Sequence, residues 1–131
     1  MLAQMRVLNI KDFILIWYNS SVYGGGYVME AIEVSHLTFS YDGKNDILKD
    51  VSFSIPKGSY TTIIGHNGSG KSTMAKLIIG LLEAKKGKIQ ILGKELNEES
   101  VYELRSHVGI VFQNPDNQFI GSTVADDIAF G

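Results

Sequence analysis

A glycine-rich stretch reads Gly65-His66-Asn67-Gly68-Ser69-Gly70-Lys71-Ser72. Its spacing fits the pattern G-x-x-x-x-G-K-[ST], in which successive backbone N–H groups surround the phosphates of a ligand. Glycines let the backbone approach a polyphosphate closely because they carry no side chain. In this pattern Lys71 is expected to bind the outer phosphates and Ser72 to offer its hydroxyl to Mg²⁺. The stretch therefore predicts nucleotide binding, and the alternative is a glycine-rich surface turn.

The residues on either side of this loop supply the context that the pattern requires. Residues 60–64 read Tyr-Thr-Thr-Ile-Ile and predict a strand. After the loop, apolar residues recur at helical spacing, at Met74, Leu77, Ile78 and Leu81. A strand, the loop and a helix in this order point the first turn of the helix at the anion.

Composition narrows the class of protein. The chain has 131 residues, of which 44% are hydrophobic and 20% are charged, as in an ordinary globular domain. Its net charge of −2 gives no global electrostatic reason to bind nucleic acid. Cysteine is absent from the sequence, which excludes disulfides and thiolate metal sites. The apolar run at residues 13–18 is shorter than the about 20 residues that span a bilayer.

Residues 1–28 differ from the rest of the chain. They show no sustained period of 2 or 3.6 and end in a glycine triplet at 24–26. We expect regular structure to begin after Met29. Our hypothesis is that Met29 is the natural start and that residues 1–28 are a flanking segment that is not native.

The stretch from 30 to 58 predicts two antiparallel strands. Apolar and polar residues alternate in it, which is typical of strands with one solvent-facing side. The alternation shifts once near His36, as at a β-bulge. Asp42–Asp46 is a predicted turn, because Asp and Asn can bond their own backbone and Gly tolerates positive φ.

Beyond the loop helix, four more elements are predicted. A strand at 89–92 is followed by a short helix over 97–105, for which Asn97 is the candidate cap. The apolar run at 108–112 predicts a strand buried on both faces. A last helix begins at Ser122 or Thr123.

Two residues outside the loop are candidate ligand contacts. Tyr41 follows the first of the antiparallel strands, and its ring could stack on an adenine. Gln113 follows the predicted buried strand, where ligands bind in open α/β sheets, and its amide could bind Mg²⁺ or orient water. Spacing alone leaves the alternatives open, namely a core or rim tyrosine and a loop amide.

Together these residues resemble the nucleotide-binding subunit of ATP-binding-cassette (ABC) transporters, over about residues 30–131. The resemblance rests on Tyr41, Gly65–Ser72 with the following Thr73, and Gln113. It implies an α/β fold of the ABC type of P-loop NTPase, with an amino-terminal antiparallel β subdomain and the start of the parallel core sheet, in truncated form. Residues 29–131 would then be the amino-terminal part of a nucleotide-binding domain.

Residues 111–119 read Val-Phe-Gln-Asn-Pro-Asp-Asn-Gln-Phe and resemble the energy-coupling-factor group, whose members drive uptake of vitamins and metal ions. The resemblance implies ATP and Mg²⁺ as cofactors. Tyr41 and residues 65–73 would contact ATP, Ser72 and Gln113 would hold the metal, and Gln113 would also position water. Gln118 is a second candidate glutamine, with a solvated loop amide as the alternative.

The resemblance also implies partners. These are a second ATPase subunit, identical or paralogous, an integral membrane subunit contacted through Gln113–Gly131, and a substrate-binding membrane component. Nucleic acid is not among them. The implied location is the cytoplasmic face of the cell membrane, as a peripheral subunit.

Three family motifs do not occur in the sequence: the signature Leu-Ser-Gly-Gly-Gln, a hydrophobic run ending in Asp-Glu, and the switch histidine. Phosphoryl transfer depends on such groups, so we expect the 131-residue chain alone not to turn over. The alternatives are a non-functional fragment of a truncated or frameshifted gene and a soluble ABC-type ATPase. A P-loop GTPase is disfavoured because Asp-x-x-Gly and Asn-Lys-x-Asp do not follow the loop.

Other polar residues are given ordinary interpretations. The His66 side chain is expected to face solvent, because its position in the loop permits almost any residue. His36 and His107 have no partners at metal-ligand spacing. Asp126 and Asp127 are interpreted as surface charges at a helix start, where the helix dipole favours them.

Overall fold

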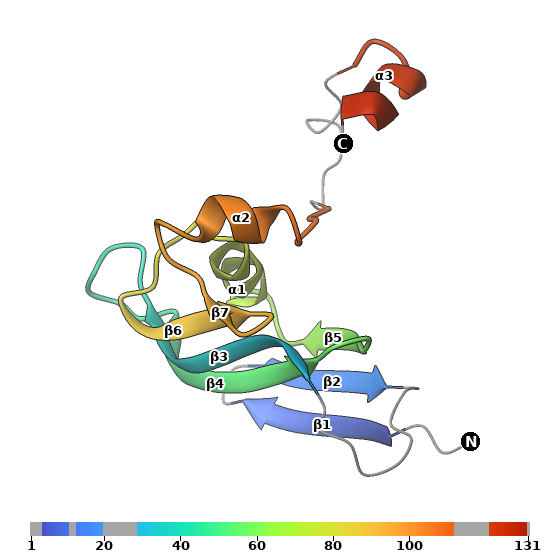
Figure 1. Ribbon diagram of the computed structural model, residues 1–131. Coiled ribbons are helices and arrows are strands. Elements are labelled where there is room, and N and C mark those ends of the chain that lie inside the picture. Colours follow the sequence, from blue (N-terminus) through green and yellow to red (C-terminus); the bar gives the residue numbers. More distant parts are fainter. Residues whose placement is uncertain (1–3, 11–12, 20–28, 112–120, 131) are drawn as a thin grey trace.

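The computed structural model describes residues 4–10, 13–19, 29–111 and 121–130. Its elements in chain order are β1 (Gln4–Ile10), β2 (Phe13–Asn19), β3 (Glu30–Phe39), β4 (Leu48–Pro56), β5 (Tyr60–Ile64), α1 (Lys71–Ile78), β6 (Lys86–Ile91), β7 (Lys94–Glu95), α2 (Val101–Arg105) and α3 (Val124–Phe130) (Figure 1). The strands form a three-stranded sheet in the order β1-β2-β5 and a four-stranded sheet in the order β4-β3-β6-β7. Among the strands described, every recorded pairing is antiparallel.

The strands β3 and β4 confirm the predicted alternation. Val34 of β3 pairs with Phe53 of β4, and both side chains are buried. The predicted bulge is also confirmed, since the register shifts between Val34 and Leu37. At the bulge, His36 has a φ of 51°, and its ring Nδ1 lies 2.7 Å from Oδ1 of Asp50, which has a φ of 50°. The irregular positions of the two strands are therefore joined by one contact between exposed side chains.

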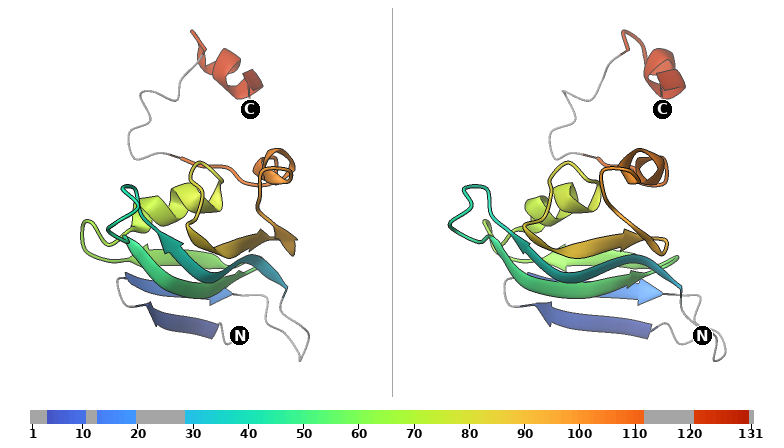
Figure 2. Two further views of the ribbon diagram at one scale, coloured as in Figure 1. Left: turned by 90° about the vertical axis from the view of Figure 1, so that its left-hand side faces the viewer. Right: turned by 60° about the vertical axis from the view of Figure 1, so that its left-hand side comes forward.

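The core lies between the four-stranded sheet and α1, which covers one face of the strands (Figure 2). Met74 and Leu77 are turned inward from α1, and Leu37 and Leu48 meet them from the sheet, all four at no more than 1% exposure. This confirms the helical spacing predicted for Met74, Leu77 and Ile78, whereas Leu81 was wrongly included, because it lies beyond the end of α1 and is 50% exposed. Truncating a buried leucine of this kind to alanine costs about 2–5 kcal/mol of stability.

Regular structure begins earlier in the chain than the sequence predicted. The prediction that it starts after Met29 was wrong, because β1 and β2 form a hairpin that pairs with β5. Ile14 pairs with Ile64, the last residue before the glycine-rich loop. Residues 13–18 are a continuous apolar run without alternation, and such a run does not reveal its secondary structure by period.

The strand predicted at 108–112 was also wrong for residues 108–111, which the structure describes. Residues 108–111 have no regular structure, and Val111 is 87% exposed, while Phe112 lies outside the described residues. A strand buried on both faces needs hydrogen-bonded neighbours and covering layers. Residues 108–111 belong to neither of the two described sheets.

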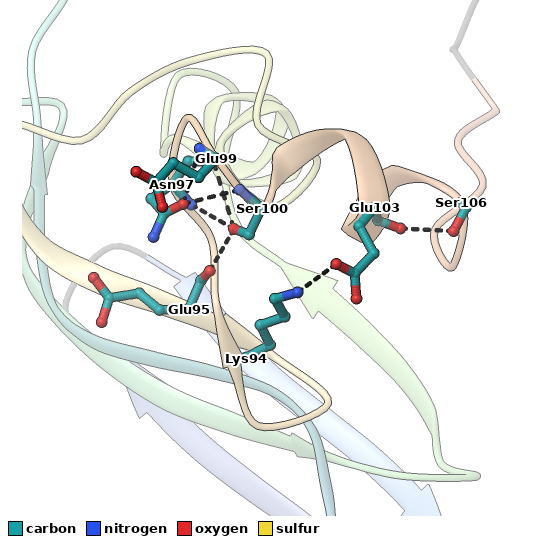
Figure 3. Close-up of polar contacts among 7 residues, drawn as sticks. All are labelled: Lys94, Glu95, Asn97, Glu99, Ser100, Glu103 and Ser106. Atoms are coloured by element: carbon teal, nitrogen blue, oxygen red, sulfur yellow. Dashed lines mark hydrogen bonds and ion pairs between the residues drawn. The ribbon is translucent and has the colours of Figure 1, made fainter.

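The short helix α2 begins later than predicted because Asn97 caps a turn in front of it (Figure 3). Asn97 Oδ1 accepts hydrogen bonds from the backbone N–H groups of Glu99 and Ser100, at 3.0 and 2.9 Å. The buried Ser100 hydroxyl donates to the Glu95 carbonyl oxygen at 2.6 Å.

Lys94 forms an ion pair with Glu103 and lowers the pKa of that carboxyl, mainly through their hydrogen bond.

The predicted start of the last helix is confirmed. Thr123 Oγ1 accepts a hydrogen bond from the Asp126 backbone N–H at 3.2 Å, ahead of α3. The side-chain hydrogen bonds of Thr123 and Ser122 lower the pKa of the Asp126 carboxyl. Asp126 and Asp127 lie in the first turn, where the helix dipole favours negative charge.

Within the described ranges, no helix is long and apolar enough to cross a bilayer.

Candidate nucleotide-binding site

The glycine-rich loop lies between β5 and α1, as the sequence predicted. β5 ends at Ile64, and α1 begins at Lys71 with Gly70 as its N-cap. Gly68 and Gly70 have φ values of 86° and 92°, in the left-handed region that glycine adopts without steric cost. The two glycines therefore let the chain reverse from the strand into the helix within a few residues.

Gly70 also marks a close approach between the loop and the sheet. A Cβ atom at this position would lie 2.7 Å from Cδ2 of Leu48, whose side chain is fully buried. Leu48 is the first residue of β4, and its side chain lies next to the loop at Gly70. The sequence around Leu48 did not indicate this contact. Gly70 is thus required by packing as well as by backbone conformation.

The amino terminus of α1 is left open to an anion. No side chain caps this helix in the described structure, and its first turn contains no acidic residue. The first N–H groups of a helix have no partner within the helix, and its dipole is positive at this end. Ser72 lies exposed in this turn, whereas Ser69 is buried. The helix therefore offers donors and positive potential beside an exposed hydroxyl.

Lys71 extends across the loop. Its Nζ donates hydrogen bonds to the carbonyl oxygens of Gly65 and His66, at 2.6 and 2.8 Å, and lies 3.4 Å from Ser69 Oγ. This geometry holds the ends of the loop together and keeps one positive charge within it. A polyphosphate bound by the loop N–H groups would meet this ammonium group directly.

Tyr41 lies beside the loop helix. Its hydroxyl is 3.2 Å from Oγ1 of Thr73, and its ring packs edge-on against Phe39, with centroids 4.9 Å apart and planes at 88°. The Tyr41 residue is 57% exposed, so its ring is only partly covered. The structure therefore brings Tyr41 next to α1, and its contact with a base remains a prediction. The Thr73 contact was not foreseen, because it joins residues far apart in the sequence.

The turn after Tyr41 is organised by one carboxylate. Asp42 accepts hydrogen bonds from the backbone N–H groups of Lys44 and Asn45, at 2.8 and 2.7 Å, and from the side chains of Ser40 and Asn45. These bonds, the Asn45 N–H first, hold the pKa of Asp42 far below its ordinary value. The predicted turn at 42–46 is thus confirmed, with Asp42 as its centre.

The remaining predicted site residues differ in outcome. His66 and Asn67 are exposed, which agrees with the expectation that His66 faces solvent. Gln113 and Gln118 lie outside the described residues. The part of the chain that the structure describes holds no group of three His, Asp or Glu residues that could bind a metal ion. A divalent cation at this loop would depend on the Ser72 hydroxyl and on the phosphates of the ligand, and the exposed position of Ser72 fits that requirement.

A cavity of about 720 Å³ lies elsewhere, between the end of α1, β6 and the turn before α2. Its lining includes Leu37, Leu77, Ile89 and Leu96, but no residue of the loop from Gly65 to Thr73. Residues 66–68 of the loop and Ser72 are instead exposed to solvent, from which a ligand would approach.

A comparison of the sequence with known protein families shows which family the chain belongs to. The sequence profile described as "ABC transporter" matches residues 48–129, which include β4, β5, the loop and α1. The chain belongs to the ABC transporter family. The α/β fold of the ABC type expected from the sequence is confirmed by a solved structure, cbiO1 from Clostridium perfringens, part of the ABC transporter complex cbiONQ. That structure has a TM-score of 0.67 and 30% identity, over 77% of this chain and 41% of its own.

Curated members of the ABC family show which group within the family this chain resembles. The energy-coupling factor transporter ATP-binding protein EcfA1 of Lacticaseibacillus paracasei is 57% identical over 76% of this chain and 36% of its own length. EcfA1 of Mycoplasma capricolum is 47% identical over 98% of this chain and 33% of its own length. The chain thus spans about a third of the length of these relatives. It is homologous to the ATP-binding subunit of energy-coupling factor transporters.

The two alignments differ at the amino terminus. Coverage of 98% must include most of residues 1–28, so this segment has a counterpart in the Mycoplasma capricolum relative. That the segment is a non-native flank and that Met29 is the natural start stays a prediction. The intact mass of protein produced from the native gene tests it.

Proposed function

We propose that this chain belongs to an ATP-binding subunit of an energy-coupling factor transporter, which couples ATP hydrolysis to uptake of a vitamin or metal ion, and that the 131 residues alone do not turn over ATP. The phosphate loop carries this proposal, because it brings the uncapped start of α1 and the Lys71 ammonium group together. Tyr41 beside α1 favours a nucleotide with an aromatic base over a simple polyphosphate. Homology to EcfA1 proteins supports the transporter class.

The residues have separate parts in this proposal. The N–H groups of the loop and of the first turn of α1 bind the phosphates, and Lys71 neutralises the outer ones. Ser72 offers its hydroxyl to Mg²⁺, which when bound would neutralise charge on the phosphates. Gln113, outside the described residues, is proposed as a second Mg²⁺ ligand and as a positioning group for water.

The proposed partners are those that the family resemblance implies. We propose a second ATPase subunit, a membrane subunit that contacts the region Gln113–Gly131, and a substrate-binding membrane component. The place of action would be the cytoplasmic face of the membrane. Co-purification with a hydrophobic membrane subunit tests this assignment, and recovery with ribosomes instead would overturn it.

Binding and turnover need separate experiments. Equilibrium dialysis with Mg²⁺-ATP should show saturable binding that Lys71→Ala weakens. Turnover by the 131-residue chain should not exceed that of the Lys71→Ala control, because the motifs that supply the hydrolytic groups are absent from its sequence. Binding that does not depend on Lys71 would contradict the proposed site. Turnover clearly above the control would contradict only the proposal of inactivity.

A further inference from the structure

The cavity of about 720 Å³ between the end of α1, β6 and the turn before α2 is a second concave surface, apart from the phosphate loop. Three of its lining residues, Leu37, Leu77 and Ile89, are core side chains with no more than 5% exposure. Leu81 lines it too and is 50% exposed, so the lining extends from the core to solvent. Pockets that take small molecules have volumes of about 300–1,000 Å³ and mostly apolar walls. The cavity therefore has the size and the apolar lining of a small-molecule site.

Hydrogen bonds fix the walls of this cavity. The Leu96 N–H donates to the Ile89 carbonyl oxygen at 2.8 Å and so ties the wall after β7 to β6. The turn that begins at Asn97 is closed by its own hydrogen bonds (Figure 3). On the side of α1, Arg105 Nη2 donates to the Gly80 carbonyl oxygen at 2.8 Å. A ligand would thus enter a preformed space and would not have to order its walls.

The charge around the cavity is one-sided. Lys88 is the one basic residue of its lining, whereas four glutamates line it, and all five residues are exposed. Four carboxylates against one ammonium group leave a formal charge of −3. Among the residues that the structure describes, these carboxylates take part in no ion pair. The glutamates are Glu83, Glu95, Glu98 and Glu99.

This arrangement favours an organic cation over a metal ion or an anion. In the described parts of the chain, no three acidic or histidine residues are placed so that they could hold a metal ion together. The carboxylates are therefore spread around the cavity and do not converge on one point. An organic ammonium group needs no such convergence, because it can stay hydrated at the mouth while its apolar body enters the cavity. An anion would be repelled by the four carboxylates.

We propose that this cavity binds a small organic ammonium ion with an apolar body. The apolar part contacts the leucine and isoleucine side chains of the lining, and the ammonium group lies among the carboxylates. The inference does not rest on the proposed binding of ATP, because no residue from Gly65 to Thr73 lines the cavity.

Three probes with the same six-carbon body test the inference: hexylammonium, hexan-1-ol and hexanoate. Each is titrated into the 131-residue chain at neutral pH and followed by backbone amide NMR. Hexylammonium should shift the amides of Ile89, Leu96 and Val101 saturably, and it should bind about threefold or more tightly than hexan-1-ol, because the carboxylates attract its charge. Hexanoate should bind most weakly. Equal affinities of the ammonium ion and the alcohol would overturn the inference, and so would tighter binding of hexanoate or shifts confined to residues outside the lining.

The charged residues of the lining provide variants with opposite expected effects. Glu98→Gln combined with Glu99→Gln should weaken hexylammonium binding about twofold or more, and Lys88→Gln should strengthen it about 1.5-fold or more. Neither change should alter the affinity for hexan-1-ol, and all three positions are exposed, so the fold should tolerate the changes. Glu103→Gln is the matched control, because Glu103 is an exposed carboxylate of α2 outside the lining. A loss of the same size in this control would overturn the inference, since it would show that net charge alone attracts the cation.

Discussion

The ammonium group of Lys71 donates a hydrogen bond to the carbonyl oxygen of Gly65, 2.6 Å away, across the phosphate loop. The first residue of the loop is thereby joined to the first residue of α1 by a side chain, in addition to the backbone between them. A second bond to the His66 carbonyl strengthens this closure. Lys71 thus has two functions, since it shapes the loop and it brings positive charge to the ligand.

Replacing Lys71 by alanine should weaken binding of Mg²⁺-ATP by about tenfold or more, because hydrogen bonds to a charged group contribute about 1.5–3 kcal/mol each. Equilibrium dialysis measures the effect. Lys76→Ala is the matched control, since this exposed lysine lies in the last turn of the same helix. Equal losses in the two variants would show that general charge, and not the position of Lys71, attracts the nucleotide.

Gly70→Ala should both destabilise the chain and disturb the loop. An alanine at a φ of 92° is strained, and its Cβ would lie 2.7 Å from the buried Leu48. Strain and overpacking together should cost about 2–5 kcal/mol. Gly93→Ala is the matched control, because Gly93 has a φ of 79° but no atom within 4 Å of its added Cβ. Chemical denaturation should rank Gly70→Ala well below Gly93→Ala, and equal midpoints would show that Leu48 does not constrain the loop.

The turn beside Tyr41 should open in acid. The Asn45 and Lys44 N–H groups lower the pKa of the Asp42 carboxyl from its ordinary 3.8, so its charge favours the folded turn. That contribution is fully present above 3.8 and is lost as the pH falls from 3.8 towards the lowered value. The amide NMR shifts of Lys44 and Asn45 should report the transition. Asp42→Asn removes the titrating group and should abolish it; a transition that persists in this variant would assign it to another group.

The local parts of the site could be predicted from the sequence. β5, the loop and α1 follow one another within the chain, and their pattern depends on neighbouring residues alone. The turn at Asp42 was equally accessible, since all its hydrogen bonds join residues 40–45. By contrast, the Leu48 contact behind Gly70 and the Thr73 bond to Tyr41 join separate elements. Single-sequence patterns carry no record of such contacts.

The two errors in the fold have the same origin. Residues 108–111 have the apolar composition of a buried strand, but they belong to neither described sheet. Residues 13–19 lack alternation, yet they form β2 because β5 supplies a partner. A segment forms a strand only when a neighbouring strand can form hydrogen bonds with it, and whether such a neighbour exists depends on the whole fold.

The amino-terminal hairpin should protect the strand that carries the loop. β2 pairs with β5 over five positions, from Tyr18 with Tyr60 to Ile14 with Ile64. A proline in the middle of β2 removes one N–H donor and breaks the pairing, so Ile16→Pro should expose the β5 edge. Hydrogen exchange at the amides of Thr61–Ile63 should then accelerate about tenfold or more, by comparison with the conservative variant Ile16→Val. The amides of β3 in the other sheet should keep their protection, and unchanged exchange in β5 would show that the hairpin does not support this strand in solution.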